Sequence, residues 1–157
     1  MLLLRFLMKA EAIVAAAAYA ATTLLLLADV VAREFFSQSL WGAQQTAILC
    51  SILAGMIGLT LATGRGAHFR PEFADGVLRF KAIDRIGDLI SAVLFAVIAY
   101  YAVEFVLESR DFGDRVPVVN LMLWPVQIVV PYAMISSAIK HAIFALSPQA
   151  KDELRTA

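Results

Sequence analysis

The chain has 157 residues, of which 61% are hydrophobic and 17% are charged, and its mean hydropathy is +0.79. Soluble domains are usually about 45 to 50% apolar, so this composition excludes an ordinary soluble fold and indicates an integral membrane protein. Thirteen Lys and Arg residues balance thirteen Asp and Glu residues, and the basic residues are spread over several short segments, which argues against a nucleic-acid partner.

Four apolar segments are long enough to cross a bilayer, whose hydrocarbon core takes about 20 helical residues. In chain order they cover about residues 12–31, 44–63, 88–107 and 119–142. Glu11 interrupts the apolar start too early for a signal peptide, so the first segment is expected to be retained as a span. The sequence therefore predicts one membrane domain over residues 1–157, an all-α four-helix bundle.

The residues between and within these spans predict further local features. Residues 33–42 are too polar for the membrane interior and too aromatic for an ordinary loop, so we expect an interfacial segment there. Small residues of the second span, among them Gly55 and Gly58, predict close helix contacts, either within this chain or with a partner. Pro125 and Pro131 remove backbone donors and predict a bend in the fourth span.

The distribution of Lys and Arg predicts the orientation of the spans. Ten of the thirteen lie before the first span, between the second and third spans, or at and after the end of the fourth, and three lie on the opposite side. Because cytoplasmic segments carry the excess of basic residues, both termini and the loop at about 64–87 are expected in the cytoplasm.

Ionisable residues inside a membrane are candidates for function, so their expected depth matters. Glu11 and Lys140 are placed about a turn from the cytoplasmic ends of their spans and Asp29 near an outer end, where such side chains snorkel or pair at the interface. Glu104 lies deepest. One expectation is that it pairs at the interface, for example with Arg110 or Arg115 beyond the end of the span. The other is that it has a polar role within the membrane.

Residues for catalysis or cofactor binding are scarce. The two histidines, His68 and His141, both fall on the expected cytoplasmic side, and we expect satisfied surface residues and not haem ligands. The sequence has no phosphate-binding glycine loop and no Cys or His-Glu cluster at metal-binding spacing, and the membrane serines lack a convincing base. The sequence predicts neither enzyme activity nor a bound cofactor.

Two stretches carry a resemblance to a known family. One is Val31-Ala-Arg-Glu-Phe-Phe36 followed by Trp41, and the other runs from Gly58 through Arg65, Gly66 and His68 to Arg70. Together with the length and the four spans, they resemble the small membrane subunit, or DctQ type, of tripartite ATP-independent periplasmic (TRAP) transporters. The family commonly has acidic residues directly after the Trp, whereas this chain has Gly-Ala-Gln-Gln, in which the glutamines are expected to keep hydrogen bonds to the same partner.

The resemblance implies a non-catalytic scaffold in a bacterial inner membrane that imports an organic acid with a sodium gradient. The implied partners are a large permease subunit, which carries the substrate and sodium sites, a periplasmic solute-binding protein, and membrane lipid. The residues expected at partner or lipid interfaces are Arg33, Trp41, Gln44, Gln45, Gly55, Gly58, Arg65, His68 and Arg70. For Arg33 and Trp41, at the outer end, the alternative is plain membrane anchoring. For Arg65, His68 and Arg70, at the cytoplasmic end, the alternative is contact with anionic lipid.

Two other classes of protein stay open. An autonomous four-helix exporter would need a carboxylate deep in the first span, whereas Glu11 is placed near its end. A haem-bearing or redox anchor subunit would need a cofactor. The sequence does not identify the transported solute, because on the transporter hypothesis other chains determine it.

Overall fold

The computed structural model describes residues 2–64 and 81–147 of the chain. Helix α1 covers Leu2–Phe36, α2 covers Ala43–Gly64 and α4 covers Lys81–Phe112, and a short α5, Trp124–Gln127, precedes α6, Val129–Leu146. Four segments are long and apolar enough to cross a membrane: Leu4–Phe36, Ala43–Gly64, Arg85–Phe112 and Trp124–Leu146. The all-α four-helix membrane bundle predicted from the sequence is confirmed for this part of the chain.

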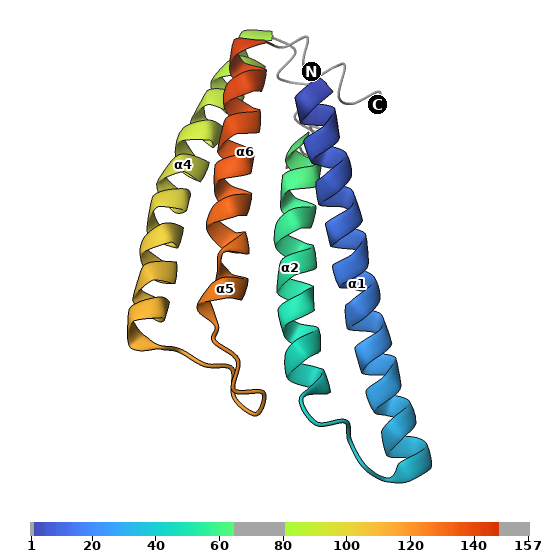
Figure 1. The fold of residues 1–157 in the computed structure, drawn as a ribbon. Coiled ribbons are helices and arrows are strands. Elements are labelled where there is room, and N and C mark those ends of the chain that lie inside the picture. Colours follow the sequence, from blue (N-terminus) through green and yellow to red (C-terminus); the bar gives the residue numbers. More distant parts are fainter. Residues whose placement is uncertain (1, 65–80, 148–157) are drawn as a thin grey trace.

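The spanning helices stand side by side in the order α4, α6, α2, α1 (Figure 1). Helix α2 packs against α1 and α6, and α6 packs against α4. At one end of the bundle, here called the terminal end, α1 and α4 begin and α2 and α6 end. The connections from α1 to α2 and from α4 to α5 lie at the opposite end, here called the loop end.

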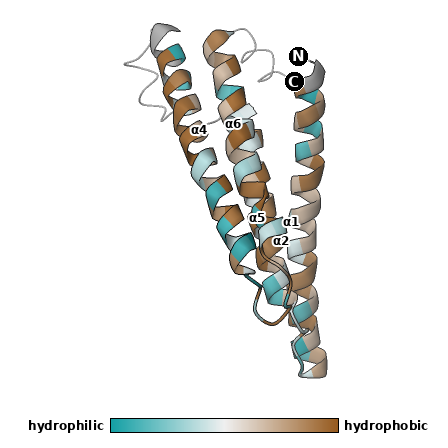
Figure 2. Cartoon of the chain, turned by 60° about the vertical axis from the view of Figure 1, so that its left-hand side comes forward, coloured by the Kyte–Doolittle hydropathy of each residue, from teal (hydrophilic) through white to brown (hydrophobic). Residues whose placement is uncertain are grey.

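Apolar residues occupy much of the length of the spanning helices (Figure 2). On α4, the side turned towards α6 carries the small buried residues Ala92, Ala99 and Ala102, whereas large apolar residues of the same helix are exposed. Small residues let two helices approach closely, and lipid takes the place of water around the large ones. The exposed set on α4 includes Leu89, Ile90, Val93, Leu94, Val97 and Phe105.

The fourth span is interrupted at Ile128, between α5 and α6. Pro131 has no backbone N–H to donate to the carbonyl of Gln127, the last residue before the interruption. Pro125 lies in the first turn of α5, where a missing donor is tolerated. The interruption thus lies one turn before Pro131, while Pro125 helps to start the helix. The helix itself begins at Trp124, later than residue 119, because the preceding residues form a turn closed by a bridge between Arg115 and Met122.

The connection between α1 and α2 is folded around Asp29, whose side chain is 1% exposed. Its Oδ1 accepts a hydrogen bond from the backbone N–H of Leu40 at 2.8 Å, and its Oδ2 lies 2.6 Å from a guanidinium nitrogen of Arg33. Gly42, just before α2, has a φ of +73°, a conformation that glycine adopts without steric cost. Asp29 is therefore a buried anchor of this connection and not a side chain that snorkels to water.

Candidate functional site

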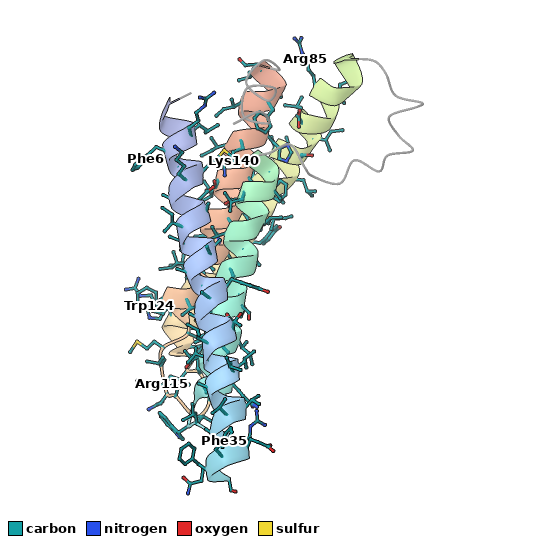
Figure 3. All side chains as sticks on the ribbon, turned by 90° about the vertical axis from the view of Figure 1, so that its right-hand side faces the viewer. Phe6, Phe35, Arg85, Arg115, Trp124 and Lys140 are labelled. Atoms are coloured by element: carbon teal, nitrogen blue, oxygen red, sulfur yellow. The ribbon has the colours of Figure 1, made fainter. Side chains whose placement is uncertain are left out.

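A buried ion pair joins the first and last spans near the terminal end. The Nζ atom of Lys140 on α6 lies 2.7 Å from Oε2 of Glu11 on α1, and the two residues are 1% and 3% exposed. Lys140 lies among the helices and not at their surface (Figure 3). The expectation that these side chains snorkel to water was wrong, because both are buried inside the bundle; the alternative, pairing, is what the structure shows, and each residue is the partner of the other.

Further hydrogen bonds satisfy this pair. Oε1 of Glu11 accepts hydrogen bonds from the hydroxyls of Tyr132 at 2.9 Å and Ser136 at 3.0 Å, and Lys140 also donates to the backbone carbonyl of Thr60 on α2 at 2.9 Å. Tyr132, Ser136 and Lys140 follow one another at four-residue intervals, so they project from the same face of α6. A buried charge pair is tolerated when its remaining donors and acceptors are also used.

The neighbouring face of α6 makes two more polar contacts, at the same four-residue interval. The hydroxyl oxygens of Thr63 on α2 and Ser137 lie 3.2 Å apart, within hydrogen-bond distance. Nδ1 of His141 lies 3.0 Å from Oδ1 of Asp88 on α4, and the imidazole stacks on the ring of Phe95 with 5.6 Å between ring centroids. His141 is 6% exposed, so the expectation of a surface histidine was wrong: α4 covers its ring.

These contacts extend along α6 from Tyr132 to His141, and we call their residues together the polar network: Glu11, Thr60, Thr63, Asp88, Tyr132, Ser136, Ser137, Lys140 and His141. It connects α6 to each of the other three spans. The network holds the helices together non-covalently, because its charged groups pair with one another between different helices. Within residues 2–64 and 81–147, no group of three or more His, Cys, Asp or Glu side chains is placed to hold a metal ion.

The middle of α2 presents an open surface. Gly55 is exposed and Gly58 is partly exposed, and a Cβ atom built on either would meet no atom within 4 Å, its own helix backbone and chain neighbours aside. The small residues there therefore do not hold another helix of this chain close. Gly64, in contrast, is buried at the end of α2 against Met8 of α1.

Several residues expected at an interface gather at the loop end. Arg33 is about half exposed and pairs with Asp29, and Trp41 is 74% exposed. Gln44 is exposed in the first turn of α2 and Gln45 beside it is partly exposed. Arg33 lies in the last turn of α1 and Trp41 in the connection to α2, so the structure brings these four residues into one region.

Glu104 is exposed on α4 and does not pair with either expected arginine in the described part of the chain. Its Oε1 accepts a hydrogen bond from the hydroxyl of Tyr100 at 2.8 Å, one turn earlier on the same helix face. Arg110 instead lies over the ring of Trp124, 5.8 Å from its centroid, and Arg115 contacts Asn120. Arg110 is six positions after Glu104, which puts it on another face of α4, and Arg115 follows the end of the helix.

The remaining candidates, Arg65, His68 and Arg70, lie outside the described residues. The polar network as a unit was not predicted from the sequence. A signal for it was present in the fourth span, where Tyr132, Ser136 and Lys140 form a polar stripe at helical spacing in an apolar segment.

Comparison with known proteins identifies the family. A family model described as "Tripartite ATP-independent periplasmic transporters, DctQ component" matches residues 22–149. The ectoine TRAP transporter small permease protein TeaB of Halomonas elongata is 22% identical to this chain over 141 residues, which cover 88% of this chain and 73% of TeaB. No solved structure gives a significant match. Since the family model covers most of its length, the chain belongs to the DctQ family of small subunits of TRAP transporters.

Proposed function

We propose that this small subunit is a non-catalytic scaffold for the large permease subunit of a secondary transporter in a bacterial inner membrane. The observation that carries the proposal is the polar network, which links α6 to all three other spans through side-chain contacts. A body cross-linked in this way is suited to remain fixed while a partner moves. Transport by the chain alone has less support, because carrier sites need groups near the midplane that are free to bind a solute.

An autonomous exporter is also disfavoured by the surroundings of Glu11. Such a protein would use a carboxylate of the first span to bind its cargo. Here Lys140, Tyr132 and Ser136 occupy both oxygens of Glu11, and the residue is almost completely buried. The geometry supports a structural role for this carboxylate.

The proposed orientation has both termini in the cytoplasm. The ten-to-three bias of basic residues supports it. The start of α1 and the end of α6 also lie at the same end of the bundle (Figure 1), as an even number of spans requires. The terminal end would then face the cytoplasm and the loop end the periplasm.

We further propose a different partner for each exposed region. The open surface of α2 at Gly55 and Gly58 would receive a helix of the large subunit, because small residues permit close approach of two backbones in lipid. The region of Arg33, Trp41 and Gln44 at the loop end would contact the periplasmic binding protein or lipid headgroups. The cargo would be an organic acid imported with a sodium gradient, both handled by the large subunit.

The contact with the large subunit can be tested by a Gly58→Leu substitution. A leucine there has room within this chain but would hold a partner helix away, so we expect several-fold less large subunit to co-purify with the tagged chain. Gly87→Leu is the matched control, because a Cβ at Gly87 of α4 is equally unobstructed. Equal recovery of the large subunit with both variants and the wild type would contradict the proposed contact surface.

A further inference from the structure

A groove lies between α4 and α6 at the terminal end. It has a volume of about 320 Å³ and is lined by Arg85, Ile86, Leu89, Ala142, Ala145 and Leu146. On α4 the apolar walls come from exposed isoleucine and leucine side chains, and on α6 the two alanines leave the space that makes the groove. It is therefore a mostly apolar groove between two membrane-spanning helices.

Two residues of the polar network, Asp88 and His141, are sequence neighbours of residues that line this groove. Asp88 lies three positions after the lining residue Arg85, and His141 lies directly before the lining residue Ala142. Nδ1 of His141 and Oδ1 of Asp88 are 3.0 Å apart. Both are buried, and their contact joins α4 to α6 directly beside the groove. The two helices that form the groove are therefore held together next to it.

A single cation stands among the lining residues. Arg85 is exposed near the start of α4 and lies at the terminal end of the bundle (Figure 3). Among the described side chains, those of residues 4–64 and 85–147, no carboxylate forms an ion pair with it. An apolar groove along two spans with one free cation at their end is complementary to an acyl chain attached to an anionic group.

We propose that this groove is a binding site for one anionic phospholipid of the surrounding bilayer. An acyl chain lies against Ile86, Leu89 and the two alanines, and Arg85 binds the headgroup phosphate. Arginine suits this role because its guanidinium forms two parallel hydrogen bonds to phosphate oxygens. The site is independent of the proposed contact with the large subunit, since it uses α4 and α6 and not the open surface of α2.

The experiment is native mass spectrometry of the full chain in detergent with phosphatidylglycerol or phosphatidylcholine added in equal amounts. We expect one phosphatidylglycerol to be retained in preference to phosphatidylcholine. Arg85→Gln should lower its retention about fivefold, which is the effect of one basic residue near an anionic membrane surface. Arg85→Lys keeps the charge but loses the two parallel hydrogen bonds, so it should lower retention less than Arg85→Gln does. Ala142→Leu, which fills the groove, should lower retention of both lipids.

Arg5→Gln is the matched control, because Arg5 is an exposed arginine near the start of α1 and does not line the groove. It should leave retention unchanged. Equal losses with Arg5→Gln and Arg85→Gln would indicate attraction to the surface as a whole and would overturn the site, as would equal retention of the two lipids by the wild type. Thermal unfolding of Arg85→Gln, an exposed position, verifies that the variant is folded.

Discussion

The two ends of the bundle are held together in different ways. Near the terminal end, side chains more than 50 positions apart in the chain meet, as Glu11 meets Lys140 and Asp88 meets His141. At the loop end, the polar contacts of Asp29 join residues no more than 11 positions apart, namely Arg33 and Leu40. Long-range contacts fix the helices relative to one another, whereas local contacts fix only the shape of one connection.

This difference separates the scaffold from the surface that meets partners. The polar network cross-links the helices where the side chains are buried, and it leaves few groups free to bind anything else. The loop end keeps large exposed side chains, including Phe35, Trp41 and Phe112. We therefore expect substitutions in the network to affect folding, and substitutions at exposed positions to affect partners or nothing at all.

The largest effect is expected from Lys140→Met. It removes the cation from a buried pair and leaves the Glu11 carboxylate without its charge partner, which typically destabilises a protein by about 3 to 5 kcal/mol. Thermal unfolding in detergent, followed by circular dichroism, should show a much lower midpoint or no folded protein.

The double variant Glu11→Leu with Lys140→Met is the informative companion to that measurement. It removes both charges together, and apolar replacement of a whole buried pair is often neutral. We expect it to recover most of the stability lost in Lys140→Met. A double variant as unstable as the single one would contradict the account of a paired buried charge.

An intermediate effect is expected from Asp29→Ala. The buried carboxylate accepts the backbone N–H of Leu40, and a hydrogen bond to a charged group contributes about 1.5 to 3 kcal/mol. Hydrogen exchange of the Leu40 amide should become faster while amides of α6 stay protected. Glu34→Ala, an exposed acidic residue of the same helix, is the control and should leave that amide protected. Loss of protection throughout α6 would show that the two ends are not independent.

The smallest effect is expected from Glu104→Gln. Glu104 is exposed, and a glutamine oxygen can still accept the hydrogen bond from Tyr100, so the unfolding midpoint should not change. Transport by the reconstituted complex should not change either. Loss of transport with unchanged stability would instead assign this side chain a polar role within the membrane.

Composition and the length of the apolar runs were sufficient to predict the four spanning helices. Pro125 and Pro131 predict a bend in the fourth span, and the structure has an interruption there, one turn before Pro131. These features depend on properties of contiguous residues. The backbone hydrogen bonds of each span must be satisfied within that span, so no knowledge of tertiary contacts is needed.

The polar network could not be predicted from the sequence, because it depends on which helices lie side by side. Distance from a helix end placed Glu11 and Lys140 near water, but whether such a residue faces water depends on which helix lies beside it. Their contact joins positions 129 residues apart. Helix order in the bundle is set by packing of many side chains, which one sequence does not reveal. The burial of His141 was not predicted for the same reason, since it is the neighbouring helix α4 that covers its ring.

The most direct test of the scaffold account is affinity purification of the tagged chain from its native membrane in mild detergent, with mass spectrometry of the proteins that remain bound. The account predicts one large multispan permease in about equal amount. Recovery of the chain alone, or only as a homodimer, would contradict it.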